Sequence, residues 1–157
     1  MADAVRPLLV QAVEIHASVD RVWDLVSDVR RMPEWSPSVV STRLRDGFER
    51  VELGTQFTNR NTHGELTWTT HAEVVRFEPG RALAFRVDEN WAVWSFTLTA
   101  TTSGTLLTQR RETPDGISDL SRELTDDFMG GQDAYSETLL AGMRETLDRI
   151  RAAAEDR

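Results

Sequence analysis

Asn59 and Asn61 are the polar residues that point most directly to ligand recognition, because both belong to a segment with the alternation of a β-strand. A tight turn centred on Gly64 and Glu65 would place Asn61 opposite Trp68 and direct both amides toward the apolar side of a sheet. A buried amide without a partner costs about 1–3 kcal/mol. Each asparagine therefore binds a ligand carbonyl or hydroxyl, or else bonds the backbone or its fellow asparagine at a splayed strand end, and the sequence leaves both interpretations open.

Two further side chains are candidates for acid–base or electrostatic chemistry. His63 shares the inward parity and an imidazole changes its charge near neutral pH, so it could act as a general acid or base; an exposed turn histidine is the plainer interpretation. His71 has the opposite parity, so the two histidines cannot share a metal, and we expect no metal site. Arg111 is the one strand arginine suited to an anionic group or a polarised carbonyl, with an edge salt bridge as the alternative.

Composition and absent motifs exclude several classes of protein. The 157 residues include no cysteine, which rules out disulfides, thiolate metal sites and a cysteine nucleophile. The motifs G-x-S-x-G, G-x-x-x-x-G-K, G-x-G-x-x-G and H-E-x-x-H do not occur either, so we expect neither covalent catalysis nor a cofactor. A net charge of −8 repels phosphate backbones and anionic membrane surfaces, and we therefore predict no nucleic-acid partner.

Four turns position these side chains in a common sheet. Turns at Gly64–Glu65, Glu78–Arg81, Glu89–Asn90 and Ser103–Gly104 join five strands whose parities agree, which is the pattern of an antiparallel sheet with one wet face. Val75, Phe77 and Val93 are apolar exceptions on the expected outer face. The expected inner face comprises Phe57, Asn59, Asn61, Trp68, Thr70, Ala72, Val74, Leu83, Phe85, Val87, Trp94, Phe96, Leu98, Leu107 and Gln109.

Helical patterns flank the strands. A first strand ending at Ala17 precedes an amphipathic helix over Val19 to Asp28, and the Pro33–Pro37 segment allows one or two more helical turns. A helix from about Asp133 to Ala154 is long enough to cross the sheet. We predict one α+β domain, 1–157, in which a curved antiparallel sheet of about six or seven strands wraps around this helix, with two short helices after the first strand. The segment 113–131 is either a cap over a cavity or a surface connection.

Aromatic residues are frequent on the inner side, and pockets for flat or lipidic ligands are lined mainly by such side chains with a few polar groups. Simple core packing is the alternative, above all for Trp94. The predicted ligand-binding residues are Trp35, Phe57, Asn59, Asn61, Trp68, Thr70, Phe85, Trp94, Phe96, Gln109, Tyr135, Leu139 and Met143.

The run from Val13 through Val22-Trp23-Asp24-Leu25-Val26 to Pro33-Glu34-Trp35-Ser36-Pro37 resembles the opening of the polyketide cyclase/dehydrase family. Similar short segments come later in the same order, including Gly54-Thr55-Gln56-Phe57 and Glu78-Pro79-Gly80-Arg81. The resemblance implies the helix-grip (START-like) fold with an internal cavity. Members bind sterols, lipids, plant hormones or polyketide intermediates, and some cyclise or dehydrate them. The true aromatase/cyclases carry an arginine on the strand that looks like Trp68–Val74, where this sequence has no inward arginine.

We therefore expect a protein that binds a small hydrophobic or aromatic molecule. The alternative is a polyketide cyclase/dehydrase in which His63 acts as acid or base and Asn61 or Arg111 polarises carbonyls; a third class is a non-catalytic partner protein. The first eleven residues are too short for a signal peptide or a membrane span, so we predict a cytoplasmic monomer or homodimer without stable membrane insertion.

Overall fold

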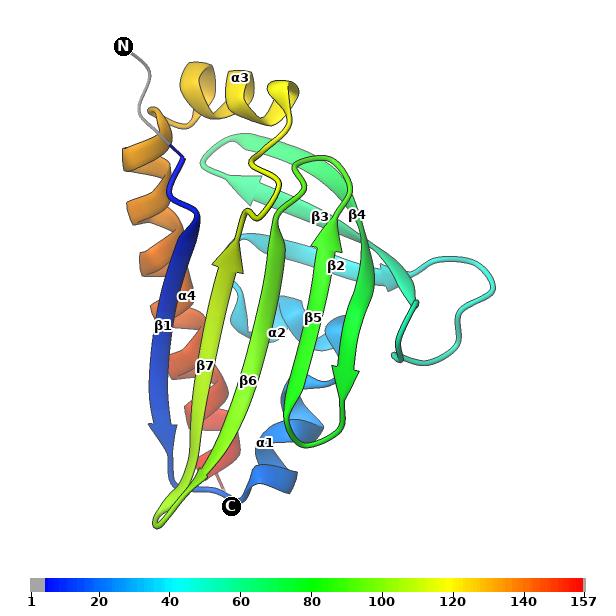
Figure 1. Cartoon of the computed structure of the whole chain (residues 1–157), viewed down its shortest axis with the longest axis vertical. Helices are drawn as coiled ribbons and strands as arrows, with labels where there is room; N and C mark the ends of the chain where they lie inside the picture. The colour runs from blue at the N-terminus through cyan, green and yellow to red at the C-terminus, as the bar shows by residue number, and fades with distance from the viewer. Residues whose placement is uncertain (1–4, 157) are drawn as a thin grey trace.

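The computed structural model describes residues 5–156 and contains a seven-stranded antiparallel sheet that curves around one long helix (Figure 1). The sheet order is β1-β7-β6-β5-β4-β3-β2. Positions 1–4 and 157 of the predicted domain lie outside the described residues. The strands are β1 (Leu8–Ile15), β2 (Val39–Leu44), β3 (Gln56–His63), β4 (Leu66–Glu78), β5 (Ala82–Val87), β6 (Val93–Thr101) and β7 (Gly104–Glu112).

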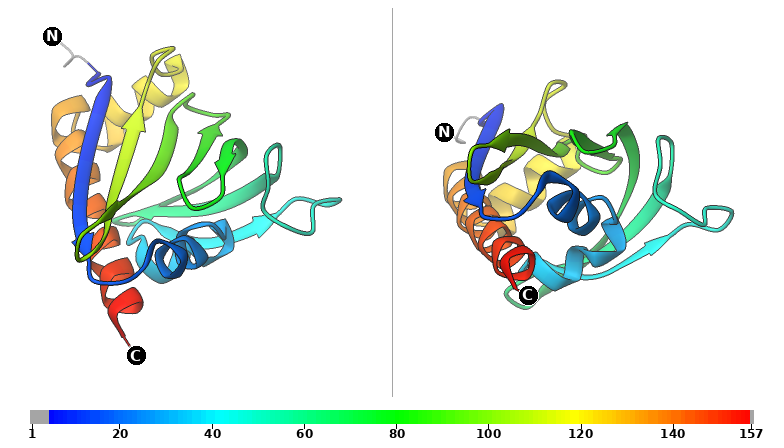
Figure 2. Two further views of the ribbon diagram at one scale, coloured as in Figure 1. Left: turned by 60° about the horizontal axis from the view of Figure 1, so that its bottom comes forward. Right: turned by 90° about the horizontal axis from the view of Figure 1, so that it is seen from below.

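The helices gather on the concave side of this sheet (Figure 2). They are α1 (Val19–Val26), the 3-10 helix η1 (Val29–Arg31), α2 (Met32–Trp35), α3 (Asp119–Phe128) and α4 (Gln132–Glu155). Ser18 begins α1, since its side chain accepts a hydrogen bond from the backbone amide of Arg21. Gly130 and Gly131 separate α3 from α4 with positive φ angles of 80° and 94°, values that favour glycine. Within residues 5–156 no helix is long and apolar enough to cross a membrane.

The predicted fold class and strand register are confirmed. Cross-strand neighbours include the predicted pairs Asn61–Trp68, Asn59–Thr70, Phe57–Ala72, Val74–Phe85 and Phe85–Trp94. Leu98 and Leu107 share a face as predicted, but Leu98 lies opposite Leu107, whereas a turn centred on Ser103–Gly104 would have placed it opposite Gln109. The predicted facing of one residue, Phe77, was wrong, since Phe77 had been expected on the outer face of the sheet. A register shift between Val74 and Arg76 turns Phe77 inward, where its ring meets that of Trp23 edge-on at 5.4 Å. A bulge of this kind adds one residue to a strand and so reverses the facing of the residues beyond it.

Two clusters of buried apolar side chains hold the layers together. The first joins α1 and the second half of α4 to β1, β6 and β7: Val13, Ile15, Val22, Leu25, Val26, Trp35, Phe96, Leu98, Leu107, Leu147, Ile150 and Ala154. The second joins η1 to β3, β4 and β5: Val29, Phe57, Ala72, Val74, Leu83, Phe85 and Val87. Where β7 begins, the backbone of Gly104 runs so close to the end of β1 that a Cβ there would overlap the carbonyl oxygen of Ile15.

Candidate ligand-binding site

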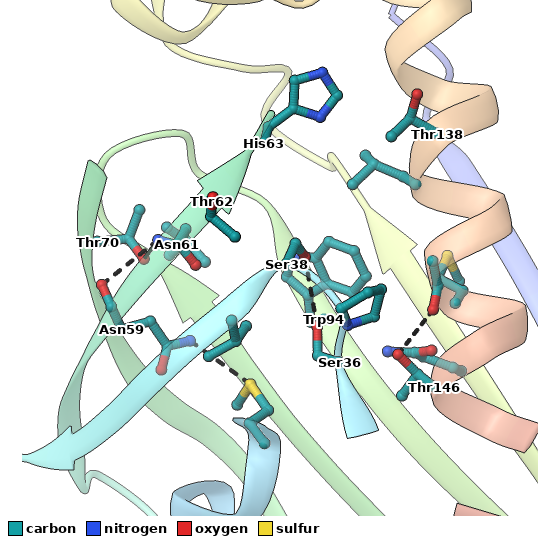
Figure 3. Close-up of a pocket in the computed structure, with 18 of the residues that line it drawn as sticks. Ser36, Ser38, Asn59, Asn61, Thr62, His63, Thr70, Trp94, Thr138 and Thr146 are labelled. Atoms are coloured by element: carbon teal, nitrogen blue, oxygen red, sulfur yellow. Dashed lines mark hydrogen bonds between the residues drawn. The ribbon is translucent and has the colours of Figure 1, made fainter. Parts of the chain in front are cut away.

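A cavity of about 400 Å³ lies between the concave face of the sheet, α2 and the first half of α4 (Figure 3). The described residues that line it include no aspartate, glutamate, lysine or arginine. They are Met32, Trp35, Ser36, Pro37, Ser38, Val39, Asn59, Asn61, Thr62, His63, Gly64, Trp68, Thr70, Phe85, Val87, Asn90, Trp94, Ser95, Phe96, Gln109, Tyr135, Thr138, Leu139, Gly142, Met143 and Thr146. The wall is thus aromatic and aliphatic, with scattered amides and hydroxyls.

All the residues predicted to bind ligand border this cavity except Phe57. Phe57 is 0% exposed and belongs to the second apolar cluster, where its ring packs edge-on against Phe85 with 5.2 Å between ring centroids. Its inward parity was predicted, but parity alone does not distinguish a core position from a cavity wall. Phe57 therefore supports the wall residue Phe85 from behind.

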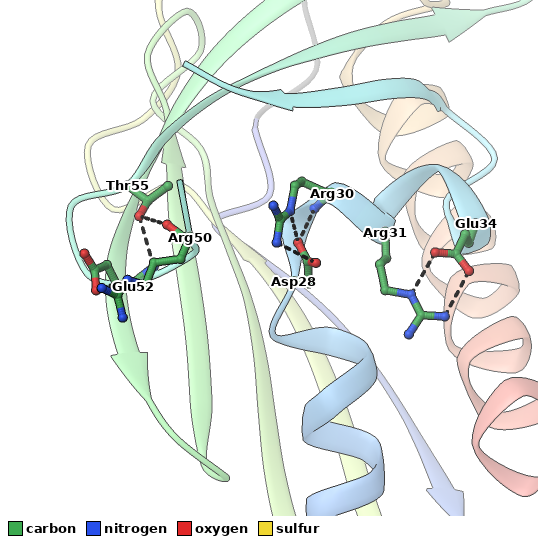
Figure 4. A network of polar contacts seen from close by, with 7 residues as sticks. All are labelled: Asp28, Arg30, Arg31, Glu34, Arg50, Glu52 and Thr55. Atoms are coloured by element: carbon green, nitrogen blue, oxygen red, sulfur yellow. Dashed lines mark hydrogen bonds and ion pairs between the residues drawn. The ribbon is translucent and has the colours of Figure 1, made fainter. Parts of the chain in front are cut away.

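Trp35 is positioned by the short helices between α1 and β2. The guanidinium of Arg31 lies 5.1 Å from the ring centroid of Trp35 and also pairs with Glu34 at 2.8 Å (Figure 4). Asp28 begins η1 by accepting hydrogen bonds from the backbone amide and side chain of Arg30. Burial alone would raise the pKa of Asp28, but the hydrogen bonds and charge of Arg30 outweigh it and lower that pKa.

The two asparagines are held by neighbouring strands. The hydroxyl of Thr42 donates to Asn59 Oδ1 at 2.6 Å. Asn61 Nδ2 donates to the hydroxyl of Thr70 at 3.0 Å and to the carbonyl of Trp68 at 3.4 Å (Figure 3). The protein itself therefore satisfies much of their hydrogen-bonding capacity, which favours the structural interpretation over direct ligand recognition.

The polar groups of β7 have no such support. Gln109 lines the cavity at 8% exposure, and its Oε1 is buried without a hydrogen-bond partner among the described residues. Arg111 lies two residues further on, opposite Trp94, outside the lining set, and is 6% exposed. The alternative of an edge salt bridge at Arg111 was wrong, since no acidic side chain within residues 5–156 pairs with it.

Tyr135 connects Arg111 to the cavity rim. Burial raises the pKa of Tyr135, with the nearby Arg111 charge opposing the change, and burial lowers the pKa of Arg111. The half-buried His63 ends β3 and meets the Tyr135 ring edge-on, with 5.9 Å between ring centroids. Two groups able to exchange protons thus lie side by side at one end of the cavity.

Several wall residues were not predicted. Thr138, Gly142 and Thr146 follow one another at intervals of four along α4, so they share a helix face, and this spacing was a usable signal. Ser36, Pro37 and Ser38 connect α2 to Val39, the first residue of β2, and this short segment gave no periodic signal. As far as the described residues extend, no three His, Asp or Glu side chains come close enough together to hold a metal ion.

A curved sheet closed by a long helix over a cavity defines a protein of the helix-grip class. The sequence matches the family described as "Polyketide cyclase / dehydrase and lipid transport" over residues 7–155, and the chain belongs to this family. No curated protein matches the sequence.

Three solved structures illustrate the likeness. The Polyketide_cyc-like protein Cgl2372 of Corynebacterium glutamicum is 29% identical, with a TM-score of 0.64 over 94% of this chain and 91% of that one. The di-domain ARO/CYC StfQ of the steffimycin pathway is 16% identical, with a TM-score of 0.75, and this chain spans 50% of it. The major latex-like protein 151 of Panax ginseng is 16% identical, with a TM-score of 0.72 over 95% and 97% of the two chains. The last two support the fold alone.

Proposed function

We propose that the protein binds a small, mainly apolar or aromatic molecule inside the cavity and carries or sequesters it. The observation that carries the proposal is a cavity of about 400 Å³ whose described lining residues include no carboxylate, ammonium or guanidinium group. This volume lies within the range of about 300–1,000 Å³ typical of small-molecule sites. Trp35, Trp68 and Trp94 supply flat apolar surfaces. The hydrogen-bonded asparagines add fixed polar points without adding charge.

A neutral fluorescent probe tests this proposal. N-phenylnaphthylamine should bind with a saturable rise in fluorescence and should raise the melting temperature, because a ligand that binds only the folded state stabilises it. Gly142→Leu should abolish both effects, since a Cβ at Gly142 already lies 3.6 Å from Pro37 and a longer side chain must extend into the cavity.

The matched control is Ala141→Leu, which adds a similar side chain on the exposed face of the same helix. It should retain full probe binding. Both variants should fold, because leucine is a good helix former and replaces a poorer one at Gly142. Equal probe binding by Gly142→Leu and the wild type would place the probe outside the cavity and contradict the proposal.

A second candidate function is cyclisation of a bound poly-ketone, which the contact between His63 and Tyr135 favours. His63 would remove a proton from a carbon between two ketones, the enolate carbon would attack another carbonyl of the same molecule, and Tyr135 would protonate the new alkoxide. Tyrosine is protonated at neutral pH, and burial raises the pKa of Tyr135 further. The proton held by His63 would then return to Tyr135, which restores both groups, and loss of the new hydroxyl with a hydrogen from the neighbouring carbon as water would complete a dehydration.

Mass spectrometry of a linear poly-β-ketone incubated with the protein tests this second function. A cyclised product one water lighter should form with the wild type and should be lost in His63→Ala. The control His16→Ala should still form it, because His16 is exposed and does not line the cavity. Product formation at equal rates with and without protein would eliminate the catalytic function and leave the binding function intact.

We also propose that the small hydrophobic molecule is the physiological partner, that nucleic acid is not, and that the protein acts in the cytoplasm as a monomer or homodimer. The net charge of −8 supports the exclusion of nucleic acid. Native mass spectrometry of protein purified from its own host would give both the ligand mass and the subunit number. A species of higher order than a dimer, or co-purifying nucleic acid, would contradict the proposal.

A further inference from the structure

The unsatisfied polar groups near the cavity lie on one strand, β7. Gln109 is 8% exposed, and its Oε1 is buried without a hydrogen-bond partner among the residues that the structure describes. Arg111 is 6% exposed, and no acidic side chain within residues 5–156 forms an ion pair with its guanidinium. Asn59 and Asn61, in contrast, are bonded to Thr42 and Thr70.

A buried guanidinium without an anionic partner is costly, because burial removes the water that would otherwise solvate its charge. Buried polar groups in folded proteins almost always find partners. Gln109 Oε1 is a buried acceptor without a partner, and Arg111, two residues along the same face of β7, is a mostly buried cation without an anionic partner. A ligand that supplies both partners explains the two observations together. One molecule can pair with both Gln109 and Arg111 only if the two side chains lie close enough together.

The register places them within such reach. Gln109 lies opposite Phe96 and Arg111 opposite Trp94, and both aromatic residues line the cavity. Residues two apart on a strand have Cα atoms separated by about 6.6–6.8 Å, and both side chains point the same way. Tyr135, which also lines the cavity, is the neighbour that influences the Arg111 charge. A ligand bound at Gln109 can thus extend its end along the Tyr135 side chain toward Arg111.

We propose that the ligand is an amphipathic acid: an apolar or aromatic body that carries a carboxylate or similar anionic group for Arg111 and a hydroxyl for Gln109. This inference rests on the proposed binding function and specifies its ligand class. Guanidinium donors match a carboxylate with two parallel hydrogen bonds. A hydroxyl satisfies Gln109 in either orientation of its amide, since it both donates and accepts.

Four naphthalene compounds separate the contributions of the two groups: hydroxynaphthoic acid, naphthoic acid, naphthol and N-phenylnaphthylamine. Isothermal titration with the wild type should rank their affinities with hydroxynaphthoic acid first, and naphthoic acid should bind roughly tenfold or more tightly than naphthol, as expected for a charge-assisted pair. The neutral N-phenylnaphthylamine reports on the cavity alone.

Two variants of adjacent residues identify the group responsible. Arg111→Met should reduce the affinity for both acids by roughly tenfold or more and leave naphthol within about twofold of the wild type. The control Arg110→Met removes the same charge from the other face of β7, where Arg110 donates to Thr97 at 2.9 Å, and should leave every affinity within about twofold. Gln109→Leu should reduce the advantage of hydroxynaphthoic acid over naphthoic acid.

Each result supports or overturns the inference. Equal binding of naphthol and naphthoic acid by the wild type, together with binding of N-phenylnaphthylamine, overturns the amphipathic acid and leaves the proposed function in place. Equal losses in Arg111→Met and Arg110→Met also overturn it, because general charge would then explain the preference. If none of the four compounds binds, the proposed function fails and the inference fails with it.

Discussion

Replacing Arg111 by methionine should make the ligand-free protein more stable. Arg111 is 6% exposed and, as far as the structure describes the chain, makes no ion pair. Methionine keeps most of the apolar stem and removes the charge. Removing a buried charge that lacks a partner relieves a desolvation penalty of several kcal/mol, whereas the void left by the shorter side chain costs roughly 1 kcal/mol.

The net gain should be about 2 kcal/mol. For a domain of this length, 1 kcal/mol corresponds to roughly 2–4 °C in melting temperature, so Arg111→Met should melt about 4–8 °C higher than the wild type. Differential scanning calorimetry and urea unfolding at pH 7 measure this directly. An acidic ligand should reverse the order, because only the wild type gains the charge-assisted bond.

Arg110→Met is the control, since it loses a half-exposed charge and a hydrogen bond to Thr97. Its melting temperature should stay within about 2 °C of the wild type. A fall of several degrees in Arg111→Met would show that the guanidinium stabilises the folded protein. The reasoning from an unpaired buried charge would then be refuted, whatever the ligand results.

Gly104→Ala should destabilise the protein by about 2 kcal/mol or more, because a Cβ would overlap the Ile15 carbonyl. Gly47→Ala, at a φ of 94° but with open space around it, should lose less stability, and urea unfolding of both variants in the opposite order would contradict the overlap. Asp28→Asn keeps a helix-capping side chain but loses the charge paired with Arg30, and should cost about 0.5 kcal/mol at pH 7. The pKa of Asp28 is lowered in the folded state, so its carboxylate stabilises the protein above the unfolded-state pKa near 4, and this stabilisation is lost as the pH falls through the folded-state pKa. Calorimetry from pH 7 to pH 3 should therefore show the melting temperatures of the wild type and Asp28→Asn converging. A difference in melting temperature that stays constant with pH would argue against a role for the Asp28 charge. Phe57→Leu should lower stability by about 1 kcal/mol and leave N-phenylnaphthylamine affinity within about twofold, and a large loss of affinity would return Phe57 to the cavity wall.

The fold could be predicted well from the sequence because tight turns fix register, and register fixes which side chains face inward. The pairs Asn61–Trp68 and Phe85–Trp94 follow from two turns alone. The bulge that reverses Phe77 could not be predicted in this way, since an inserted residue leaves the hydrophobic pattern nearly unchanged.

The candidate site was harder to predict, since it depends on partners and volume. The strand parity indicated that Asn59, Gln109 and Arg111 point inward. It did not indicate that Thr42 donates a hydrogen bond to Asn59, or that Gln109 Oε1 has no hydrogen-bond partner among the described residues. Phe57 and Phe85 have the same pattern, yet only Phe85 borders empty space. Whether inward side chains meet each other or leave a hollow depends on the curvature of the sheet and on the position of α4, which no local pattern specifies.

Helix α4 changes surroundings partway along its length. From Tyr135 to Thr146 it borders the cavity, whereas Leu147, Ile150 and Ala154 are packed into the first apolar cluster. Backbone amides in the second part should therefore resist hydrogen exchange far longer than those just after Gly131, because opening the packed part exposes more apolar surface. If the proposed function is correct, local opening of the first turns of α4 would give a ligand access to the cavity while the rest of the protein stays folded.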